Sequence, residues 1–263
     1  MIEEKLVHFV EWKKVADADL EKTMHDVRSW GVTDIVAHPI WWYKECENKG
    51  YLKRIAAMLK AADLKTPACH ALWGQGKDLA CNDESQRLIA MENHKAFLYA
   101  LAEMGVSSYT LHLGLAGATD LAFARDQIRR SVDALLPVAQ ETSIALALEN
   151  SGESLDNMHY VIDLVSSYAD PVVGLCFDTG HANYYPEAGL FELLELMKKD
   201  MVTCHMHDNY GTEDDHNPPG EGNIPWGKLV AALKACPRMH HAETESGNWS
   251  HDSWDRFYAA WNQ

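Results

Sequence analysis

The sequence predicts an α/β fold, a single (β/α)8 barrel that spans residues 1–263 as one domain. Short apolar runs alternate with longer amphipathic segments along the whole chain, which is typical of parallel βαβ units. The length of 263 residues also suits one barrel, because such a fold needs about 250 residues. No GxGxxG motif follows the first predicted strand, so an open dinucleotide-binding sheet is less favoured than a closed barrel.

Eight segments are predicted to be strands, because each is short and most are rich in β-branched or aromatic residues. They are residues 6–10, 34–37, 66–71, 108–113, 144–149, 173–178, 202–207 and 240–243. Since the carboxyl ends of the strands in such a barrel meet at one face, that face is where a site is expected.

The segments between these strands have the length of helices: residues 20–30, 52–62, 85–104, 120–141, 154–167, 191–199, 226–235 and 250–261. In the first of them Leu20, Met24 and Val27 recur at helical spacing. Gly31 follows as a C-terminal stop, and Gly105 ends the third helix in the same way. The longest predicted loop runs from residue 208 to 225, and loops of that length usually serve a function.

The composition excludes some classes of protein. A formal net charge of −16 disfavours a nucleic-acid partner, because the chain repels phosphate backbones. Glu3 and Glu4 stand where a secretory signal would carry positive charge, and no apolar run reaches membrane-spanning length. The six cysteines form no CxxC pair. We therefore expect reduced thiols in a cytoplasmic protein with no membrane partner.

Side chains that can bind a metal follow almost every predicted strand. Buried carboxylates repel one another and lose their solvation, so a cluster of them persists only when it is paired or bound to metal. A mixed set of oxygen and nitrogen donors suits Mn, Zn, Co or Mg and does not choose among them. The residues concerned are His38, His70, His112, Glu149, Asp178, His181, His205, His207, Asp208, Glu243 and Glu245.

The long loop adds further candidates. It contains Asp214, Asp215 and His216, followed by the run Pro-Pro-Gly-Glu-Gly at 218–222. Rigid prolines followed by flexible glycines favour a shaped lid that brings Asp214 and His216 over the metal, whereas the alternative is a solvated acidic loop. Residues 41, 42 and 73 are tryptophans in predicted mouth loops. They would either form an apolar wall against a sugar face or simply cover the rim of the barrel.

Four motifs resemble those of the xylose-isomerase-like barrel superfamily. They are Ala147-Leu148-Glu149-Asn150, Cys176-Phe177-Asp178-Thr179-Gly180-His181-Ala182, His205-Met206-His207-Asp208-Asn209 and His216-Asn217-Pro218-Pro219-Gly220-Glu221-Gly222, which continues through Ile224 and Trp226. That superfamily holds sugar phosphate isomerases and epimerases, ketose epimerases, inosose dehydratases and apurinic endonucleases of the endonuclease-four type. The resemblance spans strands three to eight and does not name a substrate.

The resemblance implies a set of site residues. An epimerase-type divalent metal would be bound by Glu149, Asp178, His205 and Glu243, and the two glutamates would also carry the catalytic protons. His207 is an alternative to His205 as ligand, and Glu245 is a weaker alternative to Glu243. Residues that would bind the substrate or an additional metal ion are His70, His112, His181, His207, Asp214 and His216.

The endonuclease branch of the superfamily binds three zinc ions through nine ligands. The chain has a match for each: His70, His112, Glu149, Asp178, His181, His205, Asp214, His216 and Glu243. Against this branch, DNA-binding loops should carry Lys, Arg and intercalating residues, and the predicted mouth loops at 73–78, 114–120 and 183–187 offer one Lys and no Arg. The ketose 3-epimerases usually carry an Arg in the loop after strand seven, which is missing here between His205 and Trp226.

These observations favour a divalent-metal-dependent isomerase or epimerase that acts on a sugar, a sugar phosphate or a polyol. The reaction would be proton transfer through a metal-stabilised enediolate. Loss of a hydroxyl instead would give an inosose-dehydratase-like lyase. The sequence is also compatible with a multi-zinc phosphoesterase and with a non-catalytic sugar-binding barrel. The expected partner is a small carbohydrate, and a homo-oligomer stays open because the sequence identifies no interface.

Overall fold

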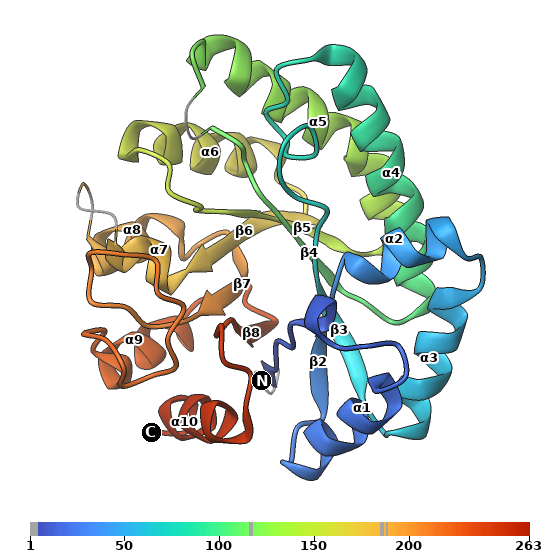
Figure 1. Ribbon diagram of the computed structural model, residues 1–263. Helices are drawn as coiled ribbons and strands as arrows, with labels where there is room; N and C mark the ends of the chain where they lie inside the picture. The colour runs from blue at the N-terminus through green and yellow to red at the C-terminus, as the bar shows by residue number, and fades with distance from the viewer. Residues whose placement is uncertain (1–4, 116–117, 185–186, 188) are drawn as a thin grey trace.

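Eight parallel strands form the centre of the molecule and helices surround them (Figure 1). This computed structural model describes residues 5–115, 118–184, 187 and 189–263. The strands pair in the order β1-β8-β7-β6-β5-β4-β3-β2. A parallel bridge between His8 and Ile35 joins the two ends of this order, so the predicted (β/α)8 barrel is confirmed. The strands are β1 (Lys5–Val7), β2 (Asp34–Ala37), β3 (Lys65–His70), β4 (Ser108–Leu111), β5 (Ala145–Glu149), β6 (Val173–Asp178), β7 (Met201–Met206) and β8 (His241–Thr244).

The helices lie outside the ring of strands (Figure 1). They are α1 (Leu20–Ser29), α2 (Ile40–Glu47), α3 (Tyr51–Ala61), α4 (Glu84–Glu103), α5 (Leu121–Thr142), α6 (Leu155–Tyr168), α7 (Thr179–Tyr184), α8 (Leu190–Met197), α9 (Trp226–Leu233) and α10 (His251–Trp261), together with a 3-10 turn at Trp12–Lys14. Among the described residues, no helix combines the length and the apolar character that crossing a membrane requires.

Several helices begin at a residue whose side chain satisfies the free backbone N–H groups of the first turn. Asp83 accepts hydrogen bonds from the backbone of the first turn of α4, and Asp120 does the same for α5. Ser154 and Ser250 cap α6 and α10. Three of the predicted helix boundaries, at 120, 154 and 250, therefore coincide with caps, which stabilise a helix end by roughly 1 kcal/mol each.

The apolar core of the described residues consists of one large cluster and two small ones. The larger part fills the space between the strands and the helices and contains most of the buried aromatic and aliphatic side chains. The smaller parts involve small residues of the strands, such as Ala145, Ala147 and Cys176 in one cluster and Ala68 in another. Small side chains on the strands leave room for polar groups, and these build the site described below.

Trp41 and Trp42 are not in a mouth loop, and that prediction was wrong. Both lie in α2, which begins directly after β2, and both are buried. The ring of Trp41 packs against that of Trp12 at 5.4 Å, and the ring of Trp42 stacks on that of Phe97 at 5.3 Å. These side chains fix α2 to the barrel, so among the three tryptophans Trp73 is the one that reaches the site.

Candidate metal centre

A cavity of about 410 Å³ opens at the carboxyl ends of the strands, where a barrel of this kind holds its ligands. It is lined by Phe9, Glu11, His70, Trp73, His112, Glu149, His181, Asp214, His216, Glu245, Ser246 and Gly247. Seven of the predicted donor residues are in this set, His70, His112, Glu149, His181, Asp214, His216 and Glu245, whereas Asp178, His205, His207 and Glu243 are not. Acidic and imidazole groups dominate the lining, and no Lys or Arg occurs among the described residues that form it.

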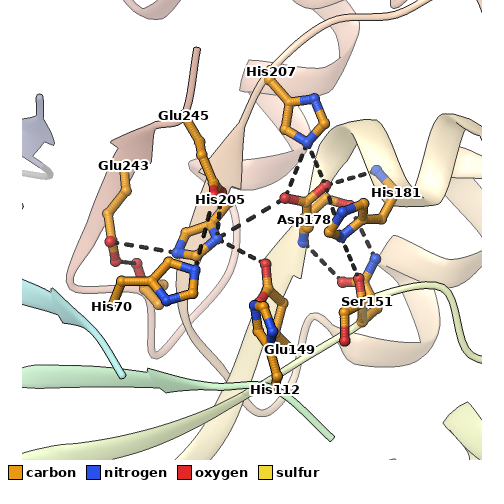
Figure 2. A network of polar contacts seen from close by, with 12 residues as sticks. His70, His112, Glu149, Ser151, Asp178, His181, His205, His207, Glu243 and Glu245 are labelled. Carbon is orange, nitrogen blue, oxygen red and sulfur yellow. Dashed lines mark hydrogen bonds and ion pairs between the residues drawn. The ribbon is translucent and has the colours of Figure 1, made fainter. Parts of the chain in front are cut away.

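Three predicted ligands come from three adjacent strands. Glu149 ends β5 and Asp178 ends β6, while His205 lies one residue before the end of β7. Asp178 pairs in register with His205. Side chains at paired positions of parallel strands point to the same side of a sheet, and Figure 2 shows these three converging. All three are buried, with exposed fractions of 1% or less.

The Nδ1 atom of His205 faces three carboxylates. It lies 2.8 Å from Oε1 of Glu149, 2.7 Å from Oε2 of Glu245 and 3.9 Å from Oδ2 of Asp178 (Figure 2). One nitrogen carries at most one proton, so it cannot satisfy two carboxylate oxygens at hydrogen-bond distance. The arrangement therefore has more negative charge than its single imidazole can neutralise.

A divalent cation fits this excess of donors. Donor atoms of Glu149, Asp178, His205 and Glu245 all lie within 4.8 Å of one another. Oε2 of Glu149 and Oε2 of Glu245 are buried, and each lies near an imidazole nitrogen, Nε2 of His112 at 3.1 Å and Nδ1 of His205 at 2.7 Å. Buried carboxylate oxygens of this kind are costly unless a charge compensates them. Three carboxylates and one imidazole are the mixed oxygen and nitrogen set that Mn, Zn or Co accepts.

The electrostatic environment points the same way. Burial favours the neutral form of Glu149, but the imidazoles of His205 and His112 outweigh it and hold the pKa of this carboxyl well below its usual range. Burial by itself lowers the pKa of His205, yet the charges around it, including those of Glu245, Glu149 and Glu243, raise that pKa well above its usual value. The protein without metal thus retains a proton at the place where a cation would bind.

Glu243 and Glu245 occupy different depths of the barrel. Glu245 lines the cavity and belongs to the donor group at Nδ1 of His205. Glu243 pairs in register with His205, is 1% exposed and is not among the residues that line the cavity. Its Oε2 lies 3.4 Å from Nε2 of His205, on the other side of the imidazole (Figure 2). Because the other donor atoms gather at Nδ1 of His205, where Glu245 lies, this grouping favours Glu245 over Glu243 as the carboxylate from this segment.

A second group of donors lies beside the first. It consists of His181, His207, Asp214 and His216, again with donor atoms within 4.8 Å of one another. Asp214 lies 3.4 Å from Nε2 of His181 and 3.1 Å from Nε2 of His216, and the rings of His207 and His216 stack at 4.0 Å. Asp178 contacts both groups, because its Oδ1 is 3.0 Å from Nε2 of His207. The long loop thus brings Asp214 and His216 to the cavity.

His70 and His112 occupy the opposite wall. Nε2 of His112 lies 3.1 Å from Oε2 of Glu149, and Nε2 of His70 lies 3.9 Å from Oε1 of Glu245. The ring of His70 packs on Trp73 with the centroids 4.6 Å apart. His70, Glu149 and His205 form a third group that could hold an ion. This group shares two residues with the first, so the two would compete for Glu149 and His205.

The model of the family described as xylose isomerase-like TIM barrel matches residues 42–246, which is more than half of the chain. This protein belongs to the xylose isomerase-like TIM barrel family. The family resemblance seen in the sequence is therefore confirmed.

Curated relatives of this family member are distant. Uncharacterized protein y4fM of Sinorhizobium fredii is 25% identical over 60% of the chain, and uncharacterized protein MJ1311 of Methanocaldococcus jannaschii is 30% identical over 38%. The chain spans 53% of the first relative and 36% of the second. The probable endonuclease 4 of Mycoplasmopsis pulmonis is 25% identical over 76% of the chain and 72% of its own length.

Solved structures with the same fold cover nearly the whole chain. The 3-keto-D-glucoside 4-epimerase YcjR from E. coli has a TM-score of 0.77 at 15% identity, covering 98% of this chain and 97% of that one. D-psicose 3-epimerase from Clostridium cellulolyticum, solved with D-tagatose, has a TM-score of 0.76 at 15% identity, covering 98% and 99%. The IOLI protein, solved with a zinc atom, has a TM-score of 0.73 at 16% identity, covering 97% and 96%.

Asn150 is a site residue of this family member that sequence reasoning named only as part of a motif. Its side chain accepts the backbone N–H of Asp178 and donates to the carbonyl of Asp178, at 2.8 and 3.0 Å. Its own backbone carbonyl lies 2.9 Å from Nδ1 of His181, which leaves Nε2 of that ring directed at Asp214. Asn150 thereby ties β5 to β6 where both contribute ligands. Its position directly after Glu149 was the available signal.

Asp208 anchors the long loop of this family member. Its carboxylate accepts hydrogen bonds from the backbone N–H groups of Asn209, Gly220 and Ile224 and from the indole of Trp226, at 2.9–3.1 Å. A Cβ atom at residue 222 would lie 2.2 Å from Oδ1 of Asp208, so glycine is required there. The buried carboxylate thus binds residues from both ends of the loop, and these hydrogen bonds hold Asp214 and His216 in position.

Replacing Asp208 with alanine should lower the free energy of unfolding by about 3 kcal/mol, because it leaves several buried donors without an acceptor. Denaturant unfolding would measure this change, and limited proteolysis would show cleavage between residues 209 and 225. Asp215→Ala, in the same loop but exposed, is the matched control and should change stability by less than about 0.5 kcal/mol. Equal effects from the two variants would contradict the anchoring role.

Proposed function

We propose that this protein is a divalent-metal-dependent isomerase or epimerase that acts on a small carbohydrate by proton transfer. The observation that carries the proposal is the convergence of two buried carboxylates, Glu149 and Asp178, and one partly buried carboxylate, Glu245, on Nδ1 of His205 beside a cavity. The fold supports it, since similar solved structures include D-psicose 3-epimerase and 3-keto-D-glucoside 4-epimerase. The zinc atom in the solved IOLI protein supports a cation in this fold.

Glu149, Asp178, His205 and Glu245 are the residues that would hold the ion. A divalent cation there would polarise a substrate carbonyl and acidify the adjacent C–H group. Glu149 and Glu245 both line the cavity, and imidazole nitrogens of His112 and His205 contact their carboxylates. These carboxylates would take the proton from carbon and return it, which moves the carbonyl or inverts the carbon.

Other cavity residues would orient the substrate. His112 contacts Oε2 of Glu149 at 3.1 Å and would keep that carboxylate in place during proton transfer. The indole of Trp73 offers a flat apolar surface on which the C–H face of a sugar ring can pack. His181, which Asn150 and Asp214 orient, would contact substrate hydroxyls.

The charge of the cavity favours a neutral substrate. Its described lining carries four carboxylates, Glu11, Glu149, Asp214 and Glu245, and no Lys or Arg. Wherever it did not contact the ion itself, a phosphate group in that lining would meet like charges and no cationic side chain except imidazolium, and juxtaposed like charges reduce binding. We therefore infer an unphosphorylated sugar or polyol as the substrate class.

Incubation with free ketoses in deuterated water should introduce deuterium at a carbon next to the carbonyl, and NMR would detect it together with the isomeric product. We expect kcat/KM for the free sugar to exceed that for its phosphorylated counterpart by about tenfold or more. Protein freed of metal by a chelator is the control and should exchange no deuterium. A phosphorylated sugar as the better substrate would contradict the inferred substrate class.

The same experiment separates the isomerase from the other candidates. A dehydrated product in place of an isomer would assign the protein to the lyases. Binding of a sugar with no exchange and no product, insensitive to chelation, would fit a non-catalytic sugar-binding barrel. Either result would overturn the proposed activity.

A phosphoesterase with several metal ions is the second candidate function. The second donor group, His181, His207, Asp214 and His216, favours it because a mononuclear isomerase does not require four further ligands. The relative described as probable endonuclease 4 has a similar sequence at 25% identity. The net charge of −16 and the acidic cavity oppose a DNA substrate. Two or more tightly bound zinc ions and cleavage of abasic-site DNA would favour this candidate.

A further inference from the structure

A line of buried polar side chains continues from His205 into the barrel, away from the cavity. Nε2 of His205 lies 3.4 Å from Oε2 of Glu243. The hydroxyl of Thr203 donates to Oε1 of Glu243 at 2.7 Å, and Nε2 of His241 lies 3.4 Å from the same oxygen. His241 in turn lies 2.9 Å from the hydroxyl of Ser108. All of these side chains are 3% exposed or less.

We propose that Glu243 is a positioning residue, which holds the Nε2–H of His205 so that Nδ1 faces the metal ion, and that Thr203 and His241 hold Glu243 in turn. This inference rests on the metal centre of the proposed function. It assigns to Glu243 a task that differs from ligation or proton transfer at the substrate.

The two nitrogens of His205 divide the neighbouring carboxylates into two sets. Nδ1 faces Glu149, Glu245 and Asp178, whereas Nε2 faces Glu243. The nitrogens of an imidazole point in different directions, so an ion bound at Nδ1 lies away from a carboxylate at Nε2. When Nδ1 binds a cation, the remaining proton of the neutral ring resides on Nε2, where Glu243 can accept it.

The carboxylate of Glu243 in turn requires a hydrogen-bond donor, which the Nε2–H of His205 can provide. Its Oε1 receives the hydroxyl of Thr203, but its Oε2 is buried and accepts no hydrogen bond from the described residues. An uncompensated carboxylate oxygen in the barrel interior is costly, and the Nε2–H of His205 is the donor placed to compensate it. Carboxylate partners of metal-bound histidines fix the tautomer and the ring orientation and raise the basicity of the ligand.

Glu243→Gln should weaken the binding of Zn²⁺ and Mn²⁺ by about 10- to 100-fold, because a neutral amide holds the Nε2–H less strongly. Competition with a chromophoric chelator would measure both dissociation constants directly, without substrate. Thr203→Val should weaken binding in the same direction by a smaller factor. Glu245→Gln, which removes a proposed ligand, should weaken binding far more than Glu243→Gln does.

A spectroscopic readout separates positioning from a general structural role. In zinc-loaded, nitrogen-15-labelled protein, the Nε2–H proton of His205 should appear as a downfield, slowly exchanging signal, and Glu243→Gln should move it upfield or remove it. His94→Gln is the matched control, because His94 is also buried and bonded at both ring nitrogens, to Tyr109 and to a backbone carbonyl, outside this network. This control should lower stability and leave metal affinity and the His205 signal unchanged.

Three outcomes would overturn the proposal. Loss of metal binding in Glu243→Gln as severe as in Glu245→Gln would make Glu243 a ligand. Unchanged affinity together with an unchanged His205 signal would remove its positioning role. Absence of any bound cation in the wild-type protein would remove both this inference and the proposed function. If metal binding depends on Glu243 but no carbohydrate exchanges deuterium, the positioning role of Glu243 stands and only the proposed isomerase or epimerase activity is overturned.

Discussion

Replacing Glu149 with glutamine should lower kcat/KM by about a thousandfold, the largest effect expected of a single substitution in this protein. An amide cannot accept the proton from carbon, and it also supplies a weaker donor to the cation. The carboxylate is buried at the cavity, and the imidazoles of His205 and His112, in contact with its two oxygens, hold its pKa well below the usual range. Steady-state kinetics and the rate of deuterium incorporation would both measure the loss.

Glu153→Gln is the matched control for this substitution. Glu153 is also buried and lies four residues along the chain, but it does not line the cavity. Burial raises its pKa, and its two oxygens accept hydrogen bonds from the backbone N–H and the hydroxyl of Ser151. In glutamine the amide oxygen can keep the N–H as its donor, and the amide NH2 can donate to the hydroxyl oxygen instead. We expect kcat/KM to change by less than about threefold. Metal analysis of Glu149→Gln would show whether the lost activity reflects a lost ion, and full turnover by this variant would contradict the proposed role.

Removal of metal should abolish activity, and titration with one equivalent of Mn²⁺, Co²⁺ or Zn²⁺ should restore it. Mass spectrometry on protein purified without a chelator or a metal-binding tag would count the ions per chain. One ion, lost together with activity, fits the isomerase or epimerase. Two or three zinc ions would favour the phosphoesterase. No ion, and none taken up on titration, would show that the strand-end cluster has another role.

Metal affinity should also rise with pH, and the sign follows from the histidines. In the protein without metal the pKa of His205 is raised well above its usual value, so at neutral pH this imidazole holds a proton that the cation must displace. Calorimetry in buffers of different ionisation enthalpy would count the protons released. Burial lowers the pKa of His216, but its hydrogen bond to Asp214 prevails and raises it to about 9. A second ion would therefore release further protons up to about that pH.

The sequence predicted the ring of strands and most of the side chains at the cavity because both depend on local patterns. Alternating apolar runs define strands, and the residue that ends a buried strand in a barrel lies at the face where ligands bind. His112, Glu149 and His181 were identified in this way and line the cavity. Residue type and position at the end of a predicted strand were therefore enough to predict these cavity residues.

The sequence could not predict how far along the barrel axis each side chain lies. Glu243 and Glu245 are two residues apart, so a period of two places both on the same side of the extended chain. Which of them reaches the cavity depends on how far β8 extends beside β7, and the register joins Glu243 to His205 itself. The helices α2 and α7 were missed for a related reason. Each follows its strand almost without a loop, since α2 begins three residues after the end of β2 and α7 begins at the residue after β6.

The bridge at His8 has a consequence for how the protein becomes stable. His8 joins β1 to β2, and its ring and the N–H of Phe9 both contact the hydroxyl of Thr244, next to Glu245. The junction between β1 and β2 is therefore linked through Thr244 to the segment that carries a proposed ligand. A cation that binds the closed barrel more tightly than an opened one stabilises the native state in proportion to the logarithm of its concentration. If the proposed function is right, the ion would serve as the cofactor and would also stabilise the closed barrel against opening.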